Sequence, residues 1–167
     1  MKNEVCVSRS ASAEARERAY EHVYQSVATI LEGESDWVAA MATAVCELHA
    51  AFDYFDWTGF YRHAEPELLV IGPYQGSHGC LRIPFARGVC GAAARERRTV
   101  LVPNVHEFPG HIACASSTES EIVVPVLSPA GKLLAVLDVD SDDPAAFTAV
   151  DQAGLERICE WLGRQYG

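Results

Sequence analysis

The chain has 167 residues, the size of one ordinary domain, and such a domain buries roughly 70% of the surface that its unfolded chain exposes. Hydrophobic residues make up 49% of the chain and charged residues 22%, a composition that excludes a disordered, collagenous or low-complexity protein. Thirteen Lys and Arg against twenty-three Asp and Glu leave a net charge of −10, which repels phosphate backbones and anionic lipid, so we expect no nucleic acid and no membrane as partners.

Residues 1–12 are predicted to form a polar tail, and residues 13–167 a single domain. The tail lacks the apolar run of a secretory signal peptide, and no later run approaches the ~20 apolar residues that span a bilayer. A cytoplasmic protein is therefore expected.

Two amphipathic helices are predicted before any strand. In the first, apolar side chains recur at i, i+3, i+4 and i+7. They are Tyr20, Val23, Tyr24, Val27, Ile30 and Leu31. Gly33 interrupts this pattern, and either Ser35 or Asp36 is placed to cap a second helix that extends to about Phe52. The apolar face of the second helix consists of Trp37, Met41, Val45 and Leu48.

From Phe55 the apolar pattern has a period of two, which is typical of strands. Short turns that contain Pro66 and Gly76 separate the predicted strands and favour a meander. These strands comprise residues 55–63, 67–73 and 80–84. Residues 88–98, rich in Ala and Arg, predict a short helix, and residues 99–102 a further strand.

Residues 103–119 are predicted to be a long loop, because they are rich in Pro, Asn, Gly and Ser and show almost no periodicity. Loops of this length in compact domains are usually functional or disordered, and we predict a functional one. Strands at 121–127 and 132–140 follow as a hairpin, and Thr148 with Asp151 can cap a final helix. This order of elements predicts an α+β fold, with an antiparallel six-stranded sheet and helices packed mainly on one face.

Three cysteines, Cys80, Cys90 and Cys114, lie outside the helical patterns, whereas Cys46 and Cys159 lie within them and are predicted to be buried, inert thiols. Cys90 begins a predicted helix beside a basic residue, Arg87, and electrostatics alone make it the most acidic thiol unless it is simply a packed small residue. Cys114 follows a histidine, His111, in the long loop, where a thiol is accessible and neighbouring charges can shift its pKa. The alternative is that Cys114 is a loop residue without a role. Cys80 suits a resolving thiol better than an attacking one.

Two acidic residues, Asp138 and Asp140, are two positions apart on a predicted strand, so their carboxylates point to the same face. Repulsion between the two like charges raises the pKa of one of these carboxyl groups. Glu121 opens the neighbouring strand and reaches the same end of the sheet. The alternative is a solvated strand end. Trp57 and Tyr61 flank a glycine on one face of the first strand, which leaves a slot for a small ligand unless the aromatic rings only pack in the core.

The histidines and cysteines between residues 78 and 114 also raise the question of a zinc site. They contain no C-x₂-C pair and no histidine tail of the usual kind. We therefore expect no metal.

Seven short motifs follow one another along the chain: DWTGFY at 56–61, GPYQG at 72–76, CLRI at 80–83, GVCG at 88–91, GHIAC at 110–114, SEIVVP at 120–125 and LDVDS at 137–141. Together they resemble the free methionine-(R)-sulfoxide reductases, which are GAF-domain enzymes. The likeness extends from about residue 20 to the C-terminus. It departs from the family pattern at Ala115, where we expect an acidic residue, and at Gly79, where we expect alanine.

The resemblance implies a GAF-like sheet, no cofactor or metal, and reduction of the R-epimer of free methionine sulfoxide. It implies that Cys114 attacks the substrate, that Cys80 forms a disulfide with Cys114, and that thioredoxin reduces this disulfide. Cys90 then lines the site. The residues that would bind substrate or donate the proton are Glu121, Asp138 and Asp140, and the wall of the site would be Trp57 and Tyr61. The family also suggests a homodimer.

Two other functions remain open at this point. GAF domains often bind small effectors without chemistry, which makes a ligand sensor the first alternative. A redox switch, in which the disulfide is itself the signal, is the second.

Overall fold

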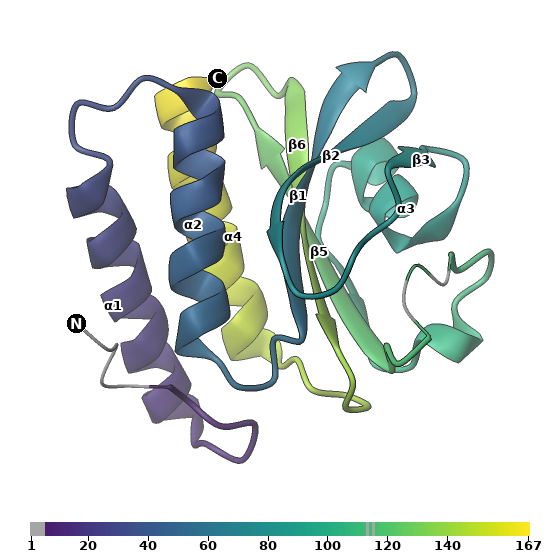
Figure 1. Ribbon diagram of the computed structural model, residues 1–167, viewed down its shortest axis with the longest axis horizontal. Helices are drawn as coiled ribbons and strands as arrows, with labels where there is room; N and C mark the ends of the chain where they lie inside the picture. The colour runs from purple at the N-terminus through teal and green to yellow at the C-terminus, as the bar shows by residue number, and fades with distance from the viewer. Residues whose placement is uncertain (1–5, 113, 115) are drawn as a thin grey trace.

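A six-stranded antiparallel sheet in the order β3-β2-β1-β6-β5-β4 forms the centre of the computed structural model, which describes residues 6–112, 114 and 116–167 (Figure 1). The strands are β1 (Trp57–Glu65), β2 (Leu68–Gln75), β3 (Arg82–Pro84), β4 (Val100–Val102), β5 (Ser120–Leu127) and β6 (Leu133–Ser141). The predicted meander and the late hairpin are both present, because β1, β2 and β3 pair in sequence and β5 pairs with β6. The predicted α+β fold is confirmed.

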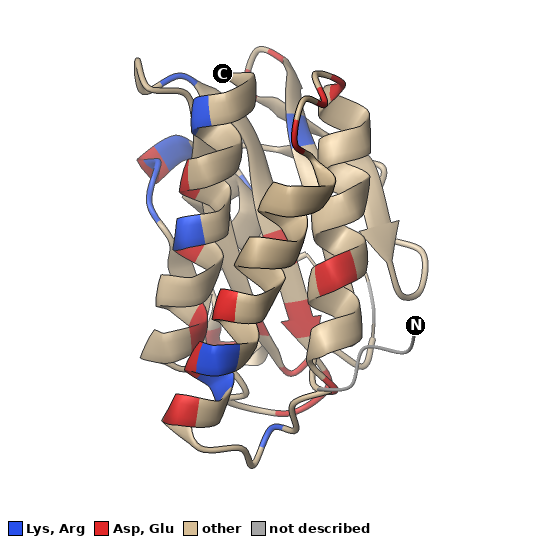
Figure 2. Ribbon diagram, turned by 90° about the vertical axis from the view of Figure 1, so that its left-hand side faces the viewer, with Lys and Arg blue, Asp and Glu red and all other residues tan. Residues whose placement is uncertain are grey.

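Three long helices cover one face of the sheet and one short helix covers the other (Figure 1). The first group is α1 (Ala13–Ile30), α2 (Trp37–Ala51) and α4 (Ala149–Tyr166), and the short helix is α3 (Gly88–Glu96). Charged residues are scattered along the outer sides of the three long helices, as Figure 2 shows, while their apolar stripes pack on the sheet. In the part of the chain that the structure describes, no helix combines the length and apolar character needed to cross a membrane.

The period of two in the strands sorts their side chains between two cores. Phe60, Ile122 and Leu137 point toward the three long helices. Trp57 and Tyr61 point the other way, into a smaller core that α3 closes. Because the chemically interesting residues of β1, β5 and β6 share the parity of this second group, the candidate site lies on the α3 face.

The helix caps agree with the sequence at both predicted sites. Asp36 rather than Ser35 caps α2, its carboxylate accepting a hydrogen bond from the backbone N–H of Ala39 at 2.8 Å. Thr148 and Asp151 form a capping box at the start of α4. The prediction for Cys46 is wrong: its side chain is exposed, because the buried face of α2 passes through the neighbouring positions.

Asp151 also ties α4 to α1 in the core. Its carboxylate is fully buried and pairs with the buried guanidinium of Arg16. The hydroxyls of Tyr20 and Tyr54 donate hydrogen bonds to the same carboxylate at 3.0 and 2.6 Å. This charge pair is tolerated away from water because the two hydroxyl groups satisfy the remaining lone pairs of the carboxylate.

Part of the predicted tail belongs to this packing. Val7 is buried and forms a parallel bridge with Phe52. The N–H of Val7 donates to the carbonyl of Ala51 at 2.8 Å, and the N–H of Asp53 donates to the carbonyl of Val7 at 3.1 Å. These contacts hold the segment around Val7 against the end of α2.

Candidate active site

A small hollow lies between the α3 face of the sheet, the first turn of α3 and the long loop. Its remaining open space is about 30 Å³, which is room for a water molecule or an ion. The lining residues include seven of the predicted site residues: Trp57, Tyr61, Cys90, Cys114, Glu121, Asp138 and Asp140. The eighth, Cys80, is bonded to one of them. The structure thus brings all the predicted residues to one place.

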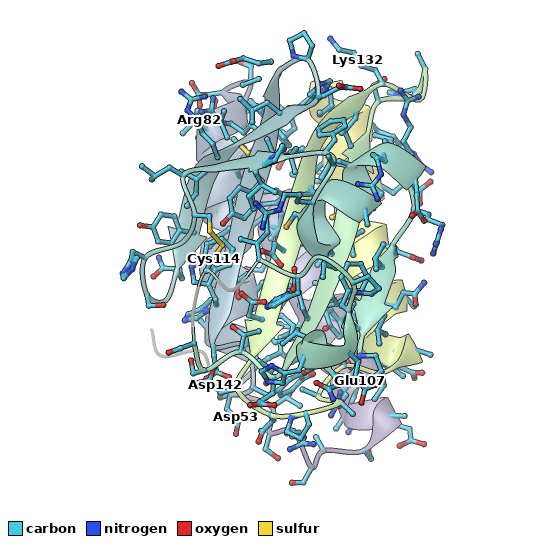
Figure 3. The ribbon with its side chains drawn as sticks, turned by 90° about the vertical axis from the view of Figure 1, so that its right-hand side faces the viewer. Asp53, Arg82, Glu107, Cys114, Lys132 and Asp142 are labelled. Atoms are coloured by element: carbon cyan, nitrogen blue, oxygen red, sulfur yellow. A yellow bond between two sulfur atoms is a disulfide. The ribbon has the colours of Figure 1, made fainter. Side chains whose placement is uncertain are left out.

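A disulfide between Cys80 and Cys114 forms one wall of this hollow (Figure 3). It joins the segment before β3 to the long loop, across 34 positions of sequence, with the two Cα atoms 5.4 Å apart. This is the pairing that the resemblance implies. The long loop carries one of the two sulfurs, and its functional role stays a prediction; Ala115, the neighbour of Cys114, lies outside the described residues.

The register of the sheet brings the three carboxylates together. Asp140 pairs with Glu121 on one side and with Trp57 on the other, and Asp138 pairs with Gly59. Glu121 and Asp138 are 6% and 5% exposed, so both carboxyl groups are largely removed from water. The prediction that these groups reach the same end of the sheet is therefore met in the structure.

Burial and mutual repulsion change the acidity of these groups. Burial raises the pKa of Asp138 to about 7, although hydrogen bonds with Cys90 and Glu121 act in the opposite direction. Burial, followed by the charge of Asp138, raises the pKa of Glu121 and the pKa of Asp140 well above their usual range. The group therefore holds protons near neutral pH, which lets it act as an acid.

The prediction that Cys90 is the most acidic thiol is wrong. Its side chain is 3% exposed, and burial together with the charges of Asp138 and Glu121 raises the pKa of Cys90 well above its usual range. The helix start and Arg87, whose side chain is exposed, do not outweigh these effects. Cys90 is therefore a neutral thiol within the hollow.

The aromatic wall differs from the predicted slot. Trp57 stacks between Tyr61 and Tyr74, with ring centroids 5.7 and 5.4 Å away. Its own ring covers Gly59, where an added Cβ would lie 2.5 Å from the Trp57 Cη2 atom. The indole N–H donates to the carbonyl of Ser77 at 2.9 Å. The slot is thus filled, and the two rings form one side of the hollow beside it.

His111 is a further residue of the site, which the sequence indicates only as a neighbour of Cys114. His111 lines the hollow, with its Nδ1 atom 3.8 Å from Oε2 of Glu121. Burial, followed by the charge of His106, lowers the pKa of His111 and favours its neutral form. The signal was the GHIAC motif, in which the histidine precedes the loop cysteine by three positions.

Comparisons with known proteins identify a family, related sequences and a related structure. The GAF domain family model matches residues 17–166. The free methionine-R-sulfoxide reductase of Saccharomyces cerevisiae is 37% identical over 155 residues, which cover 89% of this chain and 86% of the relative. The Escherichia coli enzyme of the same name is 38% identical over 133 residues, or 80% of this chain and 79% of the relative. An X-ray structure of the Neisseria meningitidis enzyme with its substrate gives a TM-score of 0.85 and 40% identity, covering 94% of this chain and 92% of that one.

Proposed function

The chain belongs to the free methionine-R-sulfoxide reductase family of GAF domains, and we propose that it reduces free L-methionine-(R)-sulfoxide to methionine. The observation that carries the proposal is the position of the Cys80–Cys114 disulfide, on the wall of a hollow that three carboxyl groups also line, two of them buried. A sulfur that can be oxidised therefore faces groups that can deliver a proton.

The reaction needs both kinds of group. The sulfur of a sulfoxide becomes electrophilic when its oxygen is protonated, and a carboxyl group with a raised pKa supplies that proton. The thiolate of Cys114 attacks the sulfur, methionine leaves with its electron pair, and the oxygen remains on Cys114 as a sulfenic acid. The thiol of Cys80 then condenses with the sulfenic acid, which releases water and forms the disulfide.

Selectivity for the free amino acid follows from the charge and size of the hollow. The α-ammonium group of the substrate needs an anionic partner, and one of Glu121, Asp138 and Asp140 provides it while another carries the proton. Trp57 and Tyr61 provide apolar surface for the methyl end of the substrate. A methionine sulfoxide within a polypeptide has no free ammonium group and brings flanking chain that the hollow excludes.

Completion of the cycle requires two electrons from outside the chain. We propose thioredoxin as their source, because a dithiol protein reduces a disulfide by thiol exchange and becomes oxidised itself. We also propose that the chain acts in the cytoplasm, as a single domain over residues 13–167, and as a homodimer. Size measurement in solution and replacement of a chemical thiol by thioredoxin test these points separately.

The direct test is production of methionine from free methionine-(R)-sulfoxide in the presence of a chemical thiol reductant. The S-epimer and a peptide that contains methionine sulfoxide serve as matched substrates and are expected to react poorly. Absence of turnover of the free R-epimer by the wild-type chain would refute the proposal.

The roles of the two sulfurs are tested without added reductant. We expect Cys114→Ser to release no methionine, and Cys80→Ser to release one equivalent per chain and then stop, because its sulfenic acid has no partner thiol. Cys46→Ser, which changes an exposed thiol on α2, is the control and should behave as the wild type. A stoichiometric first turnover by Cys114→Ser would reverse the assignment.

A further inference from the structure

The hollow contains a second cluster that the proposed reaction uses only in part. The Cys90 sulfur and one carboxylate oxygen each from Glu121 and Asp138 all lie within 4.8 Å of one another. The three side chains are buried and come from the start of α3, the start of β5 and the middle of β6. The proposed reduction gives the Cys90 sulfur no chemical step.

Two polar atoms in the same hollow are buried and have no hydrogen-bond partner among the residues that the structure describes, namely Oδ1 of Asp138 and Nδ1 of His111. Such atoms are rare in folded proteins, because each loses its interaction with water without replacement. The Asp138 side chain is 5% exposed and lines the hollow together with His111. A carboxylate oxygen and a neutral imidazole nitrogen both offer lone pairs, so the group that would satisfy them is a cation or a donor.

We propose that Cys90, Glu121, Asp138 and His111 form a binding site for a divalent ion of the zinc group, and that this ion inhibits the chain by occupying the substrate site. A thiolate and an imidazole select zinc or cadmium over magnesium or calcium, which prefer oxygen ligands alone. Binding releases the proton of the Cys90 thiol and any proton on the two carboxyl groups, and it changes no oxidation state.

Three of the four ligand atoms need only small adjustments. Zinc bonds of about 2.0–2.3 Å place the ligand atoms of a tetrahedral site roughly 3.5 Å apart. The atoms of Cys90, Glu121 and Asp138, which lie within 4.8 Å of one another, need to approach by about 1.3 Å at most. His111 is outside this group of three, and with its nitrogen 3.8 Å from the Glu121 oxygen it joins as the fourth ligand by a movement of its side chain. The open space of about 30 Å³ accepts an ion but not an amino acid in this disulfide form.

Inhibition rests on the proposed function, whereas ion binding does not. Glu121 and Asp138 belong to the set of carboxyl groups that would hold the substrate ammonium group and carry the proton. An ion bound to both takes these groups away from the substrate. The bound ion therefore inhibits reduction of the sulfoxide and leaves Cys80 and Cys114 free to form their disulfide.

The binding test uses the full chain with its disulfide intact, so that Cys80 and Cys114 are not available as thiolates. Cys6→Ser and Cys46→Ser are introduced as a background, because both of these thiols are exposed and would bind soft metals without specificity. Cadmium ion is the probe, followed by calorimetry and by the ultraviolet charge-transfer band of a cadmium–thiolate bond. We expect one ion per chain and a new band.

Variants in this background assign the ligands. Cys90→Ser should abolish the band and weaken binding by about tenfold or more, and His111→Ala should weaken binding by a similar factor with the band retained. Cys159→Ser is the matched control, because Cys159 is an equally buried thiol that lies in the other core. It should leave both the stoichiometry and the band unchanged.

Absence of cadmium binding by the background chain would overturn the proposal, as would a band that persists in Cys90→Ser. The His111→Ala variant keeps the test decisive if Cys90→Ser fails to fold. Unchanged cadmium affinity in His111→Ala would exclude His111 as a ligand and overturn the proposed four-residue site. In the activity assay, zinc ion should suppress methionine formation and a chelator should restore it. A chain that binds cadmium as expected but never reduces the sulfoxide would retain the metal site and lose the proposed function.

Discussion

Substitution of Asp138 by Asn is the most informative single change, because it should stabilise the fold while it damages the site. The carboxyl group of Asp138 is 5% exposed and has a pKa of about 7 in the folded chain, against 3.8 as the ordinary value. The folded state therefore holds a proton that the unfolded state has already lost at neutral pH. An amide of the same shape removes this difference.

The sign and size of the expected stability change follow from the linkage between proton binding and folding. Because the folded pKa is raised, the contribution to stability is fully present below about pH 4 and is lost as the pH rises through about 7. The shift is 7 − 3.8 = 3.2 pKa units, which at about 1.4 kcal/mol per unit sets a limit of about 4 kcal/mol. Glu121 and Asp140 remain beside the substituted residue, so part of the cost of burying negative charge there remains. We therefore expect Asp138→Asn to raise the free energy of unfolding by about 2–4 kcal/mol at about pH 8 and by less at about pH 5.

Urea unfolding at these two pH values measures this difference, with the disulfide intact and a chelator present to exclude metal ions. Glu32→Gln, the same change of carboxylate to amide at an exposed position between α1 and α2, should shift stability by less than about 0.5 kcal/mol at either pH. The turnover rate of Asp138→Asn should fall by about 100-fold, as expected for loss of a group that acts in proton transfer. A variant that is less stable than the wild type at the higher pH would refute the reasoning.

Three further changes test other parts of the structure. Asp151→Ala leaves the buried Arg16 charge unpaired and should lower the free energy of unfolding by about 3–5 kcal/mol in urea denaturation, whereas Glu160→Ala, which breaks an exposed ion pair, should cost under about 1 kcal/mol. Gly163→Ala places a Cβ 2.0 Å from a backbone oxygen at the end of β5 and should lower the thermal midpoint, at a cost of about 1–3 kcal/mol. Trp57→Leu removes part of the apolar wall and should raise KM for the free sulfoxide about tenfold in steady-state assays, with a smaller change in kcat.

Much of the fold follows from neighbouring residues alone. The apolar periods identify the helices and strands to within a few positions, and the caps at Asp36 and Thr148 mark two of the helix starts. The alternation along a strand places Asp138 and Asp140 on one face before any coordinates are known. The order of the seven motifs was sufficient to indicate the family.

Other properties depend on groups that are distant in the chain. The helix start beside Cys90 favours a thiolate, but burial against Asp138 and Glu121 has the larger effect on its pKa. The slot at Gly59 is absent because the Trp57 ring lies over it. The position of His111 beside Glu121 depends on how the long loop returns to the sheet.

The division has a simple physical origin. Secondary structure and side-chain parity arise from interactions over a few residues, so local sequence was sufficient to determine them. Acidity, cavity shape and unpaired buried atoms arise from desolvation and from distances between segments that only the packed chain brings together. Tertiary structure alone therefore decided which thiol is neutral, which space is open and which polar atoms lack a partner.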